Sequence, residues 1–140
     1  MLVYVYTDGA SRSNPGKSAS GYRIFDHSHK LIAKHSFYNG IKTNNQAEYL
    51  GVIEALKRIG KDHGYGNDID LYSDSQLIVH QLKGDWKVKD KDLKVLNAEA
   101  KELMAKFSSV KLTDVPRENE HIAEVDASLN ELLDEMESRG

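Results

Sequence analysis

At 140 residues the chain fits one domain, 1–140, and its hydrophobic fraction of 39% and charged fraction of 29% are typical of soluble globular proteins, which argues against disorder and a membrane class. The absence of cysteine excludes disulfides, zinc–thiolate sites and thiol nucleophiles, so any metal must bind oxygen or imidazole. The formal net charge of −3 argues mildly against a nucleic-acid partner, because phosphates favour a basic surface.

The start of the chain and its apolar segments bear on location. No apolar run approaches the roughly 18 residues that a membrane helix needs. Residues 1–4 run straight into a strand-like pattern rather than into the basic and then apolar segments of a signal peptide. We therefore expect a cytoplasmic protein.

Three strand-like segments come first. Residues 2–8 are rich in β-branched and aromatic side chains, and they end at Asp8, before a stretch of Ser, Asn, Pro and Gly. Two further runs, 21–25 and 31–38, are joined by a polar five-residue link that is typical of a hairpin. These patterns predict three antiparallel strands.

Helices and strands then alternate along the chain. Residues 43–46 have the form of a capping box, and apolar residues recur after them at helical spacing, which predicts a helix to about Lys61 that ends near Gly64. The order βββαβααβα implies an α/β fold with one mixed sheet and helices packed on it. The later elements are predicted as a strand at 68–73, a short helix at 74–82 stopped by Gly84, a longer helix at 93–107, a strand at 110–115 and a last helix that begins near Asp126.

Four acidic residues fall where such a sheet places ligand sites. Asp8 ends the first strand, Asp74 follows the fourth, Glu48 lies in the first turns of the first helix, and Asp126 opens the last helix. Clustered carboxylates repel one another, so the group predicts a cation, and an all-oxygen ligand set favours Mg²⁺ or Mn²⁺ over zinc. Two such ions about 4 Å apart form a phosphodiester-cleaving centre. Their charges would bring the formal net charge from −3 to about +1.

Each acid has a simpler interpretation when it is taken alone. Asp8, which precedes a glycine, fits turn chemistry, and Glu48 fits a solvated acid near a helix N-terminus. Asp74 and Asp126 fit helix N-caps. Taken singly, the simpler interpretation is favoured for each of the four.

The residues around three of these acids change that balance. They are Tyr6-Thr7-Asp8-Gly9-Ala10-Ser11 with Asn14-Pro15-Gly16 behind it, Asn44-Asn45-Gln46-Ala47-Glu48-Tyr49, and Tyr72-Ser73-Asp74-Ser75-Gln76-Leu77. In order and spacing these segments resemble the three acid motifs of the ribonuclease H type I family. The resemblance covers essentially the whole chain.

The resemblance implies a five-stranded mixed sheet flanked by helices, and a two-metal hydrolysis of the RNA strand of RNA–DNA hybrids that leaves 3′-hydroxyl and 5′-phosphate ends. It also implies that Asp8, Glu48 and Asp74 are metal ligands, with Asp8 bridging both ions. Because Met1 lies only seven residues before Asp8, we expect no separate N-terminal hybrid-binding module and no processive binding.

The fourth motif departs from the family pattern. Many relatives read Pro-Arg-Glu, then Asn, two residues and Ala-Asp, whereas here residues 116–119 are followed by Val125-Asp126, three residues later than that spacing predicts. We assign Asp126 as the fourth catalytic acid and metal ligand, with Glu124 as the alternative. His121 resembles a loop histidine that in some relatives helps product or a proton to leave, although an exposed loop histidine without a role is the favoured interpretation.

Amide side chains suit a hybrid substrate. A hybrid duplex is recognised by its shape, its phosphates and the 2′-hydroxyls of its shallow minor groove, and an amide can both donate to and accept from a hydroxyl. Asn44 and Asn45 fit helix caps equally well. The candidate substrate contacts are Asn14, Asn44, Asn45 and Gln76, with backbone groups near Gly9 and Ser11.

The segment 84–89 resembles the corresponding stretch of relatives that lack the family's basic protruding helix, so no such insertion is expected. Trp86 fits either a core anchor or a contact beside the DNA sugar backbone, and we favour the core. Nearby lysines fit phosphate contacts and a solvated face equally well. They are Lys83, Lys87, Lys89, Lys91 and Lys94.

Two other functions stay open. The altered fourth motif suits a catalytically weak or inactive relative that binds nucleic acid or a protein, whereas three intact acid motifs favour cleavage. Related sheets also host exonucleases and Holliday-junction nucleases, but the amide side chains favour a hybrid substrate. We therefore predict a ribonuclease H whose partner is an RNA–DNA hybrid, without an obligate protein partner.

Overall fold

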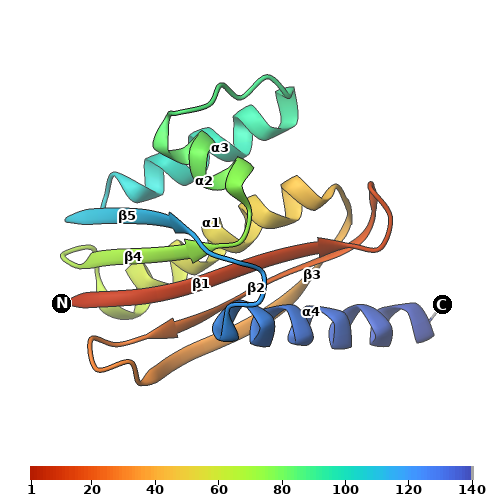
Figure 1. The fold of residues 1–140 in the computed structure, drawn as a ribbon, viewed down its shortest axis with the longest axis horizontal. Helices are drawn as coiled ribbons and strands as arrows, with labels where there is room; N and C mark the ends of the chain where they lie inside the picture. Colours follow the sequence, from red (N-terminus) through yellow and green to blue (C-terminus); the bar gives the residue numbers. More distant parts are fainter. Residues whose placement is uncertain (140) are drawn as a thin grey trace.

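A computed structural model describes residues 1–139, and its elements follow the predicted order βββαβααβα (Figure 1). The strands are β1 (Leu2–Ser11), β2 (Gly16–Phe25), β3 (Leu31–Lys42), β4 (Asp68–Ser73) and β5 (Ser109–Asp114). The helices are α1 (Asn44–His63), α2 (Gln76–Lys83), α3 (Lys91–Met104) and α4 (Glu120–Ser138).

The five strands form one mixed sheet in the order β3-β2-β1-β4-β5. The hairpin-linked strands β1, β2 and β3 pair antiparallel, as predicted, whereas β1–β4 and β4–β5 pair parallel. Tyr6 of β1 lies opposite Tyr72 of β4 in the last pair of that ladder. Asp8 and Asp74 lie two positions further along the chain from this pair, so both lie at the same end of the β1–β4 ladder.

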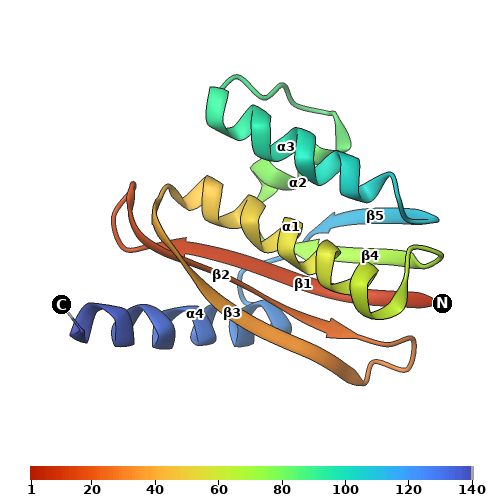
Figure 2. The ribbon, with the colours of Figure 1, turned by 180° about the vertical axis from the view of Figure 1, so that it is seen from behind.

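Helices cover both faces of this sheet, and each face has its own apolar core. On one face α1 lies against β1 and β2, with α3 outside it, as seen in Figure 2. The core on this side joins strand residues such as Val3 and Val5 to Ile53 and Leu56 of α1. On the other face α4 packs alone, and Val125, Leu129 and Leu133 meet Ala19 of β2. None of the helices within residues 1–139 combines the length and the apolar character needed to cross a membrane.

The hairpin of β1 and β2 extends further than the sequence predicts. Its ladder continues from the Asp8–Gly21 pair to the Ser11–Ser18 pair, through small and polar residues with low strand propensity. The predicted end of the first strand at Asp8 and the predicted start of the second at residue 21 are therefore wrong, because cross-strand pairing outweighs the local preference of the residues between them. β3 likewise extends to Lys42 beside the lengthened β2.

The start of α4 also differs from the prediction. The helix begins at Glu120 rather than near Asp126, because the Asn119 side chain accepts hydrogen bonds from the backbone N–H groups of His121 and Ile122 and so caps the helix. The residues that lengthen the fourth motif form the first turns of this helix. Asp126 is therefore presented from within α4 and not from its N-terminus.

Residues 84–90 join α2 directly to α3, in agreement with the predicted absence of an inserted basic helix. Trp86 in this loop is 45% exposed, so the prediction that it anchors the core is wrong. Its ring stacks on the ring of His80, with 4.4 Å between centroids. The five lysines in and beside this loop are all exposed: Lys83, Lys87, Lys89, Lys91 and Lys94.

A close contact between α1 and β1 sets the depth at which the helix lies on the sheet. Gly9 faces the backbone of Ala47 and Glu48, and a β-carbon at Gly9 would lie 2.3 Å from the Ala47 carbonyl carbon. Ser20 of β2 donates a hydrogen bond to the carbonyl of Ala47 at 2.5 Å. Only glycine at position 9 allows the helix to lie this close to the strand.

We expect Gly9→Ala to lower the free energy of unfolding by about 2–3 kcal/mol, because α1 would have to move off β1. Gly66→Ala is the matched control, since no heavy atom lies within 4 Å of a β-carbon there, and we expect a change of less than about 1 kcal/mol. Urea unfolding followed by circular dichroism measures both. Equal stability of the two variants would contradict the contact.

Candidate active site

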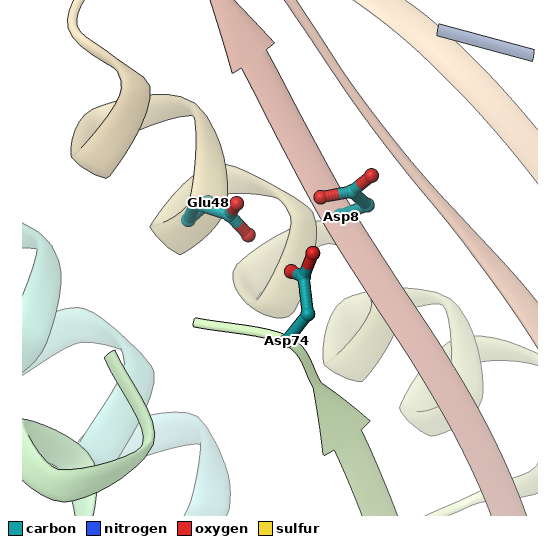
Figure 3. A group of neighbouring side chains, drawn as sticks. All are labelled: Asp8, Glu48 and Asp74. Carbon is teal, nitrogen blue, oxygen red and sulfur yellow. The ribbon is translucent and has the colours of Figure 1, made fainter. Parts of the chain in front are cut away.

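Three carboxylates from different elements converge at the end of β1. Asp8 comes from β1, Glu48 from the second turn of α1, and Asp74 directly follows β4, and Figure 3 shows their side chains turned toward one another. One oxygen of each carboxylate lies within 4.8 Å of the other two. The three acid motifs therefore meet in space as the sequence predicts.

The interpretation of Asp74 and Asp126 as helix N-caps does not fit the structure. Thr43, Ser75 and Asn119 cap α1, α2 and α4, so neither Asp74 nor Asp126 serves as an N-cap. Thr43 accepts a hydrogen bond from the backbone N–H of Gln46, and the Gln46 side chain accepts one from the backbone N–H of Thr43, which confirms the capping box. Asp74 and Asp126 are therefore free for another role.

Burial and mutual repulsion hold these carboxyls toward their protonated forms. Burial, followed by the charge of Asp74, raises the pKa of Asp8 to about 8, although the backbone N–H of Gly9, 2.9 Å from Asp8 Oδ1, acts in the opposite direction. Burial and the charges of Asp8 and Asp74 raise the pKa of Glu48 well above its usual value. Burial also raises the pKa of Asp74, and Asp126 adds to this while Arg117 opposes it.

This donor set fits a divalent cation. Glu48 Oε2 is buried and, among residues 1–139, has no hydrogen-bond partner. A buried carboxylate oxygen without a donor is unfavourable unless a cation takes the place of the donor. Oxygen ligands alone, without histidine or cysteine, suit a hard ion such as Mg²⁺ or Mn²⁺. The residues present therefore fit the predicted metal.

Asp126 lies across the same cleft, which has a volume of about 630 Å³. It is outside the group of three carboxylates that approach within 4.8 Å, but its charge contributes to the raised pKa of Asp8, Glu48 and Asp74. The alternative acid, Glu124, instead pairs with Arg23 at 2.9 Å. Of these two acids, Asp126 is the one that lines the cleft.

His121 lies in the first turn of α4, so its predicted position in a loop is wrong. Its ring contacts Tyr6 and Phe25, with 4.5 Å between centroids in each case, and its Nδ1 lies 3.8 Å from Glu124. The described residues that line the cleft do not include it. A catalytic role for His121 stays a prediction without support from this geometry.

The predicted substrate contacts divide into two groups. Gly9, Ser11, Asn44 and Asn45 line the cleft. Asn44 Oδ1 accepts a hydrogen bond from the backbone N–H of Ser11 at 2.8 Å, and the backbone N–H of Asn44 donates to Asn14 Oδ1 at 3.1 Å. The start of α1 is thus tied to the β1–β2 hairpin.

Asn14 and Gln76 form the second group, because neither is among the residues that line the cleft, and the role of Asn14 as a substrate contact stays a prediction. Gln76 is the first residue of α2, and it is exposed. Its role as a substrate contact likewise stays a prediction.

Two arginine side chains for which the sequence predicts no role line the cleft. Arg12 and Arg117 line it together with the four acids, as do Ser75 and Asn130. Arg117 belongs to the Pro-Arg-Glu segment of the fourth motif, which was an available signal for a cation near the acids. Arg12 had no such signal, because it stands in a polar turn where arginine is ordinarily solvated.

Comparison with known proteins extends this description. Residues 6–129 match the family model described as "Reverse transcriptase-like". Ribonuclease HI of Halobacterium salinarum is 41% identical over 133 residues, which cover 95% of this chain and 65% of that protein. A bifunctional protein of Mycobacterium tuberculosis is 36% identical over 118 residues, which cover 84% of this chain and 32% of that protein. The chain thus spans less than two thirds of the length of these relatives.

Solved structures agree with these matches. The crystal structure of RNase H1 from Halobacterium salinarum superposes with a TM-score of 0.90 at 38% identity and covers 96% of this chain and 99% of that one. The N-terminal RNase H domain of a Mycobacterium tuberculosis protein gives 0.91 at 32% identity, covering 99% of each chain. LC11-RNase H1, crystallised in complex with RNA/DNA hybrid, gives 0.85 at 32% identity and covers 92% of this chain and 94% of that one.

The sheet order and the acidic cleft thus define a ribonuclease H-like fold. With residues 6–129 matched by the family model and close similarity to named ribonucleases H, the chain belongs to the ribonuclease H family. Members of this family depend on a metal, and the buried acids of this chain are suited to bind one.

The raised pKa of Asp8 predicts a pH-dependent stability in the absence of metal. The folded protein keeps a proton on Asp8 up to about pH 8, whereas the unfolded chain releases it near pH 4. Folding therefore takes up protons in this interval, and the free energy of unfolding falls as pH rises through it. Since one pKa unit corresponds to about 1.4 kcal/mol, we expect a fall of at least that size.

Urea unfolding in EDTA at pH 5 and pH 8 measures this dependence. Asp8→Asn removes the titrating group and flattens the dependence, whereas Glu131→Gln, an exposed acid on α4, leaves it unchanged. A wild type that is equally stable at both pH values would rule out the repulsion described here.

Proposed function

We propose that this protein hydrolyses the RNA strand of RNA–DNA hybrids as a metal-dependent endonuclease, leaving 3′-hydroxyl and 5′-phosphate ends. The observation that carries the proposal is the convergence of Asp8, Glu48 and Asp74 in a cleft that Asp126 also lines. Membership of the ribonuclease H family supports it. So does the similarity to LC11-RNase H1, which was crystallised in complex with RNA/DNA hybrid.

The metal is proposed to be Mg²⁺, with Mn²⁺ as an alternative, and two ions are proposed for each site. Asp8, Glu48, Asp74 and Asp126 would hold them. Bound metal supplies an activated water and a positive charge for the leaving oxygen. The chain's own contribution is to hold four carboxylates in one cleft. Without bound metal, burial and mutual repulsion favour the protonated forms of Asp8 and Glu48.

Substrate selection is proposed to depend on the polar rim of the cleft. Asn44 and Asn45 line it beside Ser11, and the hydrogen bonds that tie Asn44 to Ser11 and Asn14 hold this rim in place. Amides that accept from and donate to a 2′-hydroxyl distinguish RNA from DNA in a shallow minor groove. Gly9 is proposed to place its backbone close to the reacting phosphate, and Gln76, at the start of α2, is a further proposed contact.

Cleavage is supported over binding without catalysis. The feature that favoured an inactive protein was the irregular fourth motif, and α4 offsets the altered spacing because Asp126 reaches the cleft from within the helix. A cytoplasmic location and the absence of an obligate protein partner stay predictions from the sequence.

We expect the protein to cut the RNA strand of a labelled RNA–DNA hybrid in Mg²⁺, and to leave matched single strands and both homoduplexes intact. EDTA abolishes cutting. Asp8→Asn lowers the rate at least about 10³-fold, because a carboxylate that holds metal is lost. Asp126→Asn lowers the rate by a smaller factor of at least about tenfold, since Asp126 lies outside the closest group of acids.

Glu131→Gln is the matched control, because it makes the same acid-to-amide change on an exposed position of α4. It keeps the wild-type rate. If the wild type binds hybrid in Mg²⁺ and in Mn²⁺ but never cuts it, the enzyme proposal fails and binding alone takes its place.

A further inference from the structure

One arginine in the turn after β1 holds the C-terminal half of α4. Its guanidinium donates to the backbone carbonyl of Asn130 at 3.0 Å and to Glu137 Oε2 at 3.0 Å, and it pairs with Asp134 Oδ1 at 2.9 Å. Residues 130, 134 and 137 are spaced by four and three positions, so they lie on one face of the helix. Arg12 is 28% exposed and also lines the cleft.

Asn130 connects this arginine to the fourth acid. Its Oδ1 lies 3.3 Å from Arg12 Nη2 and accepts a hydrogen bond. Its Nδ2 donates to Asp126 Oδ2 at 3.2 Å and to the Asp126 backbone carbonyl at 3.1 Å. Because a guanidinium only donates, Arg12 selects the amide orientation in which Oδ1 faces it and the NH₂ group faces Asp126.

Asp126 needs such support more than the other acids do. Asp8 and Asp74 are fixed by neighbouring strands, and Glu48 by the close contact of α1 with β1. Asp126 stands on a helix that packs on the opposite face of the sheet, and its charge is repelled by the three acids across the cleft.

We propose that Arg12 and Asn130 are positioning residues for Asp126, which hold its carboxylate toward the cleft in the orientation that a metal requires. The inference rests on the proposed function, in which Asp126 is a metal ligand. Asn130 acts directly on the carboxylate, and Arg12 acts through Asn130 and by docking α4 on the β1–β2 hairpin. Removal of either therefore weakens metal binding beyond any effect on stability.

The test is a calorimetric titration with Mn²⁺, accompanied by the cleavage rate on the hybrid. We expect Asn130→Ala and Arg12→Ala each to weaken Mn²⁺ binding about tenfold, and Arg12→Lys to give a smaller loss, since a lysine cannot donate to several acceptors at fixed geometry. Arg139→Ala is the matched control. It removes another arginine–acid pair of α4, with Glu135 at 2.6 Å, on an exposed side chain that does not line the cleft, and it leaves binding unchanged.

A second background separates positioning from structure. In Asp126→Asn protein the group to be positioned is absent as a carboxylate, so Asn130→Ala causes no further loss of Mn²⁺ affinity. Equal losses with and without the Asp126 carboxylate would overturn the proposal, as would wild-type affinity in Asn130→Ala protein. If Arg12→Ala does not fold, Arg12→Lys and the exposed Asn130→Ala still decide the matter.

The two proposals fail in different ways. A wild type that binds Mn²⁺ and loses affinity in Asn130→Ala, yet never cuts hybrid, leaves the positioning pair intact and refutes the nuclease. A wild type that cuts hybrid while Asn130→Ala changes neither affinity nor rate refutes the pair alone. A wild type that binds neither Mn²⁺ nor Mg²⁺ and cuts no hybrid refutes both.

Discussion

Repulsion between buried carboxylates is the constraint around which this structure is organised. Asp8, Glu48 and Asp74 lie close together; burial raises the pKa of each, Asp74 raises the pKa of Asp8, and Asp8 and Asp74 raise the pKa of Glu48. Flexible segments would relieve this repulsion by moving apart. In this protein the acids instead lie on, or directly beside, regular elements. The parallel pairing of β1 with β4 fixes Asp8 relative to Asp74, and the close packing of α1 on β1 at Gly9 fixes Glu48. Backbone pairing and close packing thus keep the three carboxylates together against their electrostatic repulsion.

The lengthened β1–β2 hairpin connects the two layers of helices. On one side its Ser11 binds Asn44 at the start of α1, and on the other its turn residue Arg12 binds α4. The acidic cleft lies between these attachments. A substitution in the turn would therefore alter the positions of both α1 and α4, which form the two sides of the cleft, although the turn itself contains none of the four acids.

Local signals in the sequence were sufficient for the order of elements, the capping box at Thr43 and the meeting of three acids, because each depends on a short motif or on strand order. The start of α4 was missed, since the Asn119 cap lies in a segment whose spacing had suggested a loop. Contacts made by Arg12 were also beyond prediction, because they join residues more than a hundred positions apart. Trp86 was misplaced because apolar character alone does not specify burial when a neighbouring ring, here His80, is available for stacking.

The exposed position of Trp86 has an optical consequence. It is the only tryptophan of the chain. Fluorescence excited at the red edge of the protein's absorption band, where tryptophan absorbs and tyrosine does not, therefore comes from the loop between α2 and α3 and not from either apolar core. Its quantum yield depends on the imidazole stacked beside it and on solvent at its open face. Fluorescence of this protein therefore reports the local state of that loop, and a signal change there need not coincide with loss of the sheet, which far-ultraviolet dichroism follows.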